Sequence, residues 1–178
     1  MKTKSLIIIA ILAGAIQVLA QDAPKIGYTN ADYVLSLLPE AKQIDAELKA
    51  YEKQLQNQLQ AKYANYEKLV ADYQENAPAY DELIRADKEQ EIAQLQQSIQ
   101  KFSQDAENSL MTKRTTLLKP AYEKIGNAIE TIAIENGYSH IFSAGAPGFD
   151  VLLYAREQDD VSDLILLKLG ITPPAKGE

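Results

Sequence analysis

The stretch that decides the fold runs from Glu40 to Asn76 and reads EAKQIDAELKAYEKQLQNQLQAKYANYEKLVADYQEN. It contains neither glycine nor proline and is rich in alanine, leucine, lysine, glutamate and glutamine, which lose little free energy on entering a helix. Its apolar positions recur with a mean step of about 3.6 residues, the period of a straight α-helix. We therefore predict one long amphipathic helix, with Pro39 in its first turn. The apolar stripe consists of Ile44, Leu48, Tyr51, Leu55, Leu59, Tyr63, Tyr66, Val70 and Tyr73.

The helical pattern breaks at Asn76-Ala77-Pro78-Ala79, because proline disfavours helix at the preceding residue and cannot continue the hydrogen-bond ladder. A second helix is predicted to begin near Tyr80 and to fold back along the first. This antiparallel hairpin, residues 40–116, is called the arm. Facing positions are predicted to pair Leu55 with Phe102, Leu48 with Leu110, and Tyr63 with Ile92. The predicted arm core is Leu48, Tyr51, Leu55, Leu59, Ile92, Leu95, Ile99, Phe102 and Leu110.

Short elements flank the arm on its N-terminal side. Lys25 to Tyr28 is predicted to form a strand, and Asn30 is suited to cap a short helix from Ala31 to Leu38. On the C-terminal side, Pro120 indicates either a kink or break where the arm ends, or a tolerated proline with a local bend.

Helix is predicted to continue from Ala121 to Asn136, where Asn136-Gly137 is a typical stop signal. Two apolar runs follow, Tyr138–Ala144 and Asp150–Ala155, and the Gly145-Ala146-Pro147-Gly148 segment between them predicts a hairpin-like strand pair. A last helix is predicted from Asp160 to Gly170, and residues 172–178 are expected to form a flexible tail. The predicted domains are a signal peptide at 1–20, a body of 21–39 and 117–171, the arm at 40–116, and the tail.

The first twenty residues have the pattern of a signal peptide. Lys2 and Lys4 form a positive start, Leu6 to Ile16 is apolar, and Val18-Leu19-Ala20 offers small residues for cleavage. The apolar run is shorter than the roughly 20 residues that a membrane-spanning helix needs. We therefore expect export to the periplasm and no stable membrane insertion.

Composition excludes several classes of function. Removing Lys2 and Lys4 from the 18 basic residues leaves 16 against 25 acidic ones, which disfavours nucleic acid as a partner. The chain has no cysteine, so disulfides and thiol chemistry are absent. Its single histidine, His140, lies in an apolar run without a second histidine, and the adjacent Asp159 and Asp160 are better suited to a loop or cap. No phosphate-binding loop or nucleophile motif occurs, so we expect no enzyme activity, cofactor or metal.

The order of segments along the mature chain resembles the Skp/OmpH family of periplasmic chaperones. The resemblance is carried by Lys25-Ile26-Gly27-Tyr28-Thr29-Asn30, Leu117-Leu118-Lys119-Pro120, Asn136 to Phe142, Val151 to Tyr154, and Asp160-Val161-Ser162-Asp163. It implies a mainly α fold in which a helical-hairpin tentacle is inserted in a small β-barrel-like oligomerisation body. It also implies a homotrimer whose arms enclose unfolded outer-membrane proteins. The body residues expected to mediate association are Ile26, Tyr28, Ile141, Phe142, Val151, Leu152, Leu153 and Tyr154.

Client binding is expected on the arm surface, where tyrosines offer an apolar face and a polar edge that tolerates water. The candidate residues are Tyr63, Tyr66, Tyr73, Tyr80, Leu83 and Ile84. The same tyrosines at helical spacing are also compatible with packing in the hairpin core. The tip of the arm, residues 76–91, has five acidic side chains against Arg85 and Lys88, a departure from the positive tips of the best-known family members. This puts a preference for acidic clients, or for lipopolysaccharide, in doubt here.

Three functions are compatible with these patterns. The first is an ATP-independent holdase, which needs many weak and adaptable contacts on a large surface. The second is a structural coiled-coil spacer or adhesion subunit of the envelope, although the strict heptads typical of such proteins are not sustained. The third is a small-ligand or polysaccharide-binding module, which requires a preformed pocket that the arm does not suggest.

Overall fold

The computed structural model describes residues 23–145 and 152–175, and the chain falls into two compact units. The hairpin unit consists of residues 31–127. The strand unit consists of the described residues before 31 and after 127. The signal peptide predicted at 1–20, and Val151 among the predicted body residues, lie outside the described residues.

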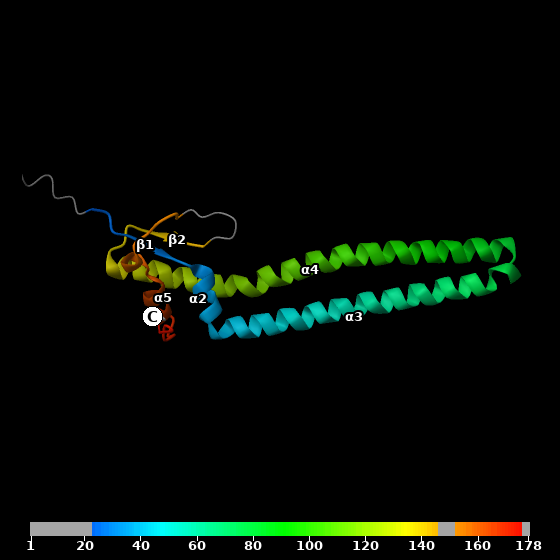
Figure 1. The fold of residues 1–178 in the computed structure, drawn as a ribbon, viewed down its shortest axis with the longest axis horizontal. Coiled ribbons are helices and arrows are strands. Elements are labelled where there is room, and N and C mark those ends of the chain that lie inside the picture. The colour runs from blue at the N-terminus through cyan, green and yellow to red at the C-terminus, as the bar shows by residue number, and fades with distance from the viewer. Residues whose placement is uncertain (1–22, 146–151, 176–178) are drawn as a thin grey trace, which may run out of the picture. The chain divides into compact units, whose positions relative to one another are not determined.

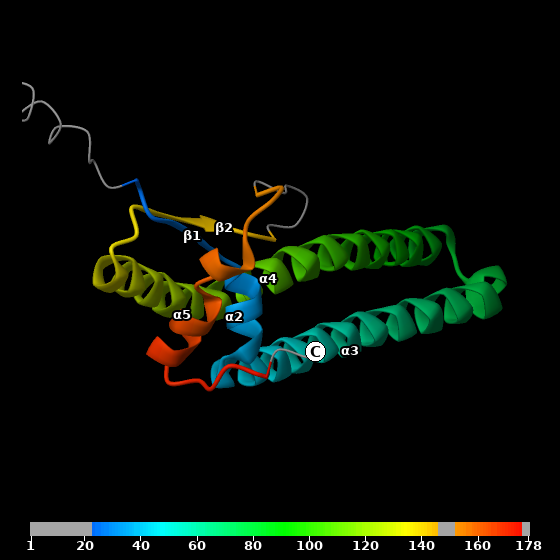
Figure 2. The ribbon, with the colours of Figure 1, turned by 60° about the vertical axis from the view of Figure 1, so that its left-hand side comes forward.

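The hairpin unit is entirely helical. It contains α2 (Ala31–Leu37), α3 (Pro39–Asn76), the short 3-10 helix η2 (Ala77–Ala79) and most of α4 (Glu82–Asn136). Helix α3 and the part of α4 in this unit run side by side in opposite directions (Figures 1 and 2). The mainly helical fold, the long hairpin and the break at Pro78 are therefore confirmed.

Local chemistry explains where the arm helices begin and end. Pro39 occupies the first turn of α3, where its missing N–H is not needed, and Leu38 before it is extended. Helix α3 ends at Asn76, whose side-chain amide donates to the Asp72 carbonyl oxygen at 3.1 Å. At the start of α4, Asp81 Oδ1 accepts a hydrogen bond from the backbone N–H of Ile84 at 2.8 Å, which satisfies one of the unpaired donors of the first turn.

The strand unit holds a two-stranded parallel sheet in which β1 (Ile26–Thr29) pairs with β2 (His140–Ser143), so that Ile26 lies opposite His140. It also contains the end of α4, the 3-10 helix η3 (Glu157–Asp159) and α5 (Ser162–Lys168). Gly137, with φ of 69°, follows α4 directly, and Tyr138 N–H donates to the Ala133 carbonyl at 2.9 Å. This left-handed cap confirms the predicted stop at Asn136-Gly137.

The predicted hairpin of two strands after α4 is wrong for the described residues. The first run forms β2, but residues 152–155 adopt no strand, while Asp150 lies outside the described part of the chain. Strand β2 pairs instead with β1, and the other side of β1 is used by Val161, whose N–H donates to the Tyr28 carbonyl at 2.9 Å. An apolar run does not specify the identity of its partner strand. A two-stranded sheet does not close, so the barrel-like body remains a prediction.

Pro120 does not end the helix. It lies inside α4, which continues to Asn136, so the alternative of a tolerated proline is confirmed. Three threonines precede it, and each donates its hydroxyl to the carbonyl four residues back, as Thr116 does to Thr112 at 2.9 Å. Such bonds compete with the backbone ladder and accompany helix bends.

Each unit has its own small set of buried side chains. In the strand unit, Thr29 Oγ1 and Ser162 Oγ form a buried hydrogen bond of 2.9 Å. A Cβ atom on Gly27 would lie 3.0 Å from the Tyr138 ring and 3.1 Å from Val161, so a side chain at this strand position would have to displace these neighbours. The buried apolar residues are Ala128, Ile132, Val161, Ile165 and Leu166 in the strand unit, and Val34, Leu38, Ile99, Ala121 and Ile125 in the hairpin unit.

Candidate functional site

The arm has a thin apolar seam. Helix α3 contains no buried residue along its 38 positions. On the α4 side of the arm, Ile99 is buried, with 4% of its surface exposed. The other predicted core residues are half-buried along one face of each helix: Leu48, Tyr51, Leu55, Leu59, Ile92, Leu95, Phe102 and Leu110. A two-helix layer has no interior beyond this seam, so most of the arm surface is open to contact.

Side-chain contacts across the arm fix how the two helices face one another. Lys62 Nζ donates to Ser98 Oγ at 3.2 Å and lies 5.5 Å from the centre of the Phe102 ring. Tyr63 shares a groove with Ile99. The predicted pairing of Tyr63 with Ile92 is therefore displaced along α4 toward Ile99.

Among the shallow grooves along the arm, two are lined in part by the predicted arm tyrosines. The first has a volume of about 170 Å³ and is lined by Tyr63, Tyr66, Gln96, Ile99 and Gln100. Tyr63 is 49% exposed and Tyr66 is half-buried, so these two tyrosines combine seam packing with an accessible face. The second groove is lined by Tyr51, Asp105, Asn108, Ser109 and Thr112. The accessible tyrosine faces offer an apolar surface for adaptable contacts.

The tyrosines near the tip are held by carboxylates. Tyr73 donates its hydroxyl to Glu89 across the turn, and this hydrogen bond raises the pKa of Tyr73 above its usual value. Tyr80 donates to Asp72 Oδ2 at 3.4 Å, and the Tyr73 and Tyr80 rings lie 6.5 Å apart with a tilt of 38°. Tyr73 and Tyr80 are half-buried, whereas the two other tip candidates, Leu83 and Ile84, are exposed.

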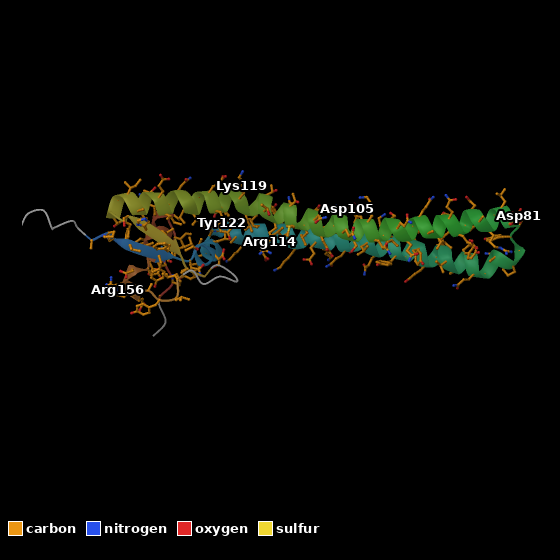
Figure 3. All side chains as sticks on the ribbon, turned by 90° about the horizontal axis from the view of Figure 1, so that it is seen from above. Asp81, Asp105, Arg114, Lys119, Tyr122 and Arg156 are labelled. Atoms are coloured by element: carbon orange, nitrogen blue, oxygen red, sulfur yellow. The ribbon has the colours of Figure 1, made fainter. Side chains whose placement is uncertain are left out.

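The base of the hairpin unit carries contacts that the sequence analysis missed. Lys124 Nζ donates to Glu40 Oε1 at 2.5 Å, and this bond lowers the pKa of Glu40. Tyr122 donates to Asp32 Oδ1 at 2.6 Å, which raises the pKa of Tyr122. Figure 3 shows Tyr122 near the hairpin base, Asp105 midway along α4 and Asp81 at the α3–α4 turn. No local motif identifies these pairs, because the partners are more than 80 residues apart in sequence.

The strand unit exposes many of the side chains predicted to mediate association. Leu153 is 89% exposed and Tyr154 is 83% exposed. Ile26 and Phe142 are exposed on neighbouring strands, whereas Tyr28, Ile141 and Leu152 are half-buried. Large apolar side chains that are exposed to this degree in a single chain are candidates for an interaction surface.

The polar residues considered for chemistry lie on an exposed strand, in a loop and at the start of a helix. His140 is exposed on β2 and its Nδ1 lies 3.2 Å from Ser139 Oγ. Asp160 Oδ1 accepts from Ser162 N–H at 2.8 Å at the start of α5, and Asp159 pairs with Arg156 at 3.0 Å, in agreement with the predicted cap and loop roles. In residues 23–145 and 152–175, no group of three or more acidic or histidine side chains is placed to hold a metal ion. Within the same ranges, no helix is long and apolar enough to cross a membrane.

Comparisons with known proteins identify one family and one similar fold. The model of the outer membrane protein (OmpH-like) family matches residues 25–169. A crystal structure of a candidate OmpH-like outer membrane chaperone from Caulobacter crescentus CB15 has a similar fold, with a TM-score of 0.68 and 13% sequence identity. The match covers 89% of this chain and 93% of that one. A search of curated protein sequences found no match.

Proposed function

Because the chain belongs to the OmpH-like family of outer membrane proteins, we propose that it is a periplasmic, ATP-independent holdase chaperone. Its clients under this proposal are unfolded outer-membrane proteins, which it binds between helical arms and keeps from aggregating. The description of the Caulobacter crescentus protein as an outer membrane chaperone supports the role, although at this identity the structural likeness itself concerns the fold.

The observation that carries the proposal is the open arm. A holdase must contact many different unfolded sequences, which favours a large surface with weak, adaptable contacts over a single deep pocket. Helix α3 buries none of its 38 residues, and the Tyr63 and Tyr66 groove is shallow. Tyrosine rings suit such contacts because they bring large apolar area at the cost of only two side-chain torsions.

We propose that the strand unit mediates assembly into a homotrimer. The support is the apolar surface that one chain leaves open, with Leu153 and Tyr154 more than four-fifths exposed. The two-stranded sheet is also small for an isolated sheet and gains from pairing or packing with further strands. Export through the N-terminal signal sequence would place the assembly in the periplasm.

Suppression of aggregation tests the function directly. A urea-denatured β-barrel membrane protein is diluted into buffer with increasing amounts of the purified mature chain, and light scattering is recorded without ATP. We expect scattering to fall as the chaperone approaches stoichiometric amounts. Absence of suppression at every ratio contradicts the proposal. The spacer or adhesion alternative predicts assembly of the chain without any effect on scattering.

A matched pair of variants locates the activity on the arm. Tyr63→Ser removes a half-exposed ring from the groove. Gln60→Ser is the control, because it also introduces a serine, at an exposed position about one turn earlier. We expect Tyr63→Ser to need more chaperone for half-suppression and Gln60→Ser to match the wild type. Size-exclusion chromatography with light scattering of both variants, expected to give a trimer mass, controls for loss of assembly.

A further inference from the structure

The start of α4 exposes two large aliphatic side chains. Leu83 is 81% exposed and Ile84 is 44% exposed, although both lie in an ordered helical turn. Asp81 accepts the backbone N–H of Ile84, so the capping interaction holds the turn in place. Both side chains remain exposed when the hairpin is formed, Leu83 over most of its surface. They form an apolar patch at the tip that is accessible to a partner.

The charges around this patch are mostly negative. The tip contains five acidic residues, at positions 81, 82, 87, 89 and 91, and two basic ones, Arg85 and Lys88. Both cations are engaged within the tip. Arg85 Nη2 donates to the Ala77 and Tyr80 carbonyl oxygens at 3.3 and 3.4 Å, and Lys88 pairs with Glu91 at 3.0 Å. Both positive charges are therefore engaged in contacts within the turn and the first turns of α4.

Two carboxylates remain available next to the apolar patch. Glu82 and Asp87 are exposed, and neither makes a hydrogen bond or ion pair within the described residues. Asp87 lies four residues after Leu83, so the two side chains share one face of α4. The dipole at the start of α4 offsets only about half an elementary charge, which leaves the tip negative.

We propose that the tip binds segments of unfolded polypeptide in which apolar side chains stand next to lysine or arginine. The apolar side chain packs on Leu83 and Ile84, while the cation reaches Asp87 or Glu82. The inference rests on the proposed holdase function and defines which client segments the tip selects. Acidic segments and anionic lipid surfaces are repelled by the same carboxylates over the Debye length of about 10 Å at 0.1 M salt.

Two labelled peptides test the proposed preference on the full mature chain. The two peptides have the same length and the same apolar residues. In one peptide lysine alternates with the apolar residues, and in the other glutamate takes the place of lysine. Exposed ion pairs are individually weak, so we expect the lysine peptide to bind only about fivefold more tightly at low salt. The preference should shrink toward none in 0.5 M sodium chloride. Fluorescence anisotropy measures both affinities.

Variants assign the preference to the tip. Glu82→Gln with Asp87→Asn removes the available carboxylates and leaves the Asp81 cap intact. Glu67→Gln with Glu107→Gln is the control, because it makes the same change in net charge at exposed positions elsewhere on the arm. We expect the tip variant to lose the lysine preference and the control to keep it. Leu83→Gln should weaken binding of both peptides, whereas Met111→Gln, at another exposed apolar position on α4, should leave both affinities unchanged.

Equal affinity for the two peptides overturns the inference, as does a lysine preference that survives the tip variant. Binding of the wild-type tip to vesicles of anionic phospholipid, lost on Leu83→Gln, also overturns it. The aggregation assay separates the two proposals. Suppression of aggregation without a peptide preference contradicts this inference and leaves the holdase function supported. A peptide preference without suppression contradicts the holdase function and leaves only the binding preference of the tip.

Discussion

The burial of Ile99 makes a sharp prediction about the strength of the arm. Replacing a buried isoleucine with alanine costs about 2 to 5 kcal/mol, because transfer free energy is lost and a cavity remains. Ile99 lies in a thin seam beside the half-exposed Tyr63 and half-buried Tyr66, which can settle into the vacated space. Alanine also has the higher helix propensity, which returns about 0.4 kcal/mol. We therefore expect the low end of the range, about 2 kcal/mol.

Hydrogen exchange measures this cost where it arises. A loss of about 2 kcal/mol raises the local opening constant roughly 30-fold, so amides near Ile99 in α4 should exchange about 30-fold faster in Ile99→Ala. Leu83→Ala is the control, because Leu83 is 81% exposed and the substitution should change exchange little. If Ile99→Ala leaves exchange near the wild-type rate, or if Leu83→Ala accelerates it equally, the single-layer account of the arm is refuted.

Three further predictions follow from other contacts. Gly27→Ala should destabilise the chain by about 1 to 3 kcal/mol in urea unfolding, because its Cβ would lie 3.0 Å from the Tyr138 ring, while Gly126→Ala, with open space around it, should not destabilise. The pKa of Glu40 is lowered in the folded state by its hydrogen bond with Lys124. The stability that this pair contributes is therefore present above the ordinary glutamate pKa of about 4.3, and it is lost as pH falls through the lowered folded pKa. The stability of Lys124→Met, measured by urea unfolding at decreasing pH, should lack this loss at acid pH. The same loss in Lys124→Met as in the wild type would contradict the role of the Glu40–Lys124 pair. The pKa of Tyr73 is raised in the folded state by its hydrogen bond with Glu89. The stability that this hydrogen bond contributes is therefore present below the ordinary tyrosine pKa of about 10, and it is lost as pH rises through the raised folded pKa. The Glu89→Gln substitution should lower the pKa of Tyr73, and ultraviolet titration measures this change.

The helices were predictable because their signals are local. Composition and period establish α3, Pro78 establishes its end, and Asn136-Gly137 establishes the end of α4. The facing of the two helices was displaced from the prediction, because it depends on how many residues the turn uses. The turn carries η2 and then Tyr80 and Asp81 before α4 starts, and a pattern within each helix does not encode that number.

The sheet was harder to predict because its partners are distant in sequence. Ser139 N–H donates to the Lys25 carbonyl at 2.8 Å, and Ala144 N–H donates to the Thr29 carbonyl at 2.8 Å. The run Tyr138–Ala144 was recognisable as a strand, yet the turn signal Gly145-Ala146-Pro147-Gly148 favoured the next apolar run as its partner. Gly27 held a usable clue, since a glycine within a strand signals the close approach of another group.

The apolar period of the arm links its structure to the proposed function. A mean step of about 3.6 residues keeps the stripe on one face of a straight helix, whereas a step of 3.5 would wind two helices into a continuous coiled coil. Burial along the arm seam is uneven, because Ile99 is only 4% exposed while the other residues of the arm core are half-buried. Accessible tyrosine faces therefore remain along a hairpin that is already formed, so a client can be held without unfolding the arm.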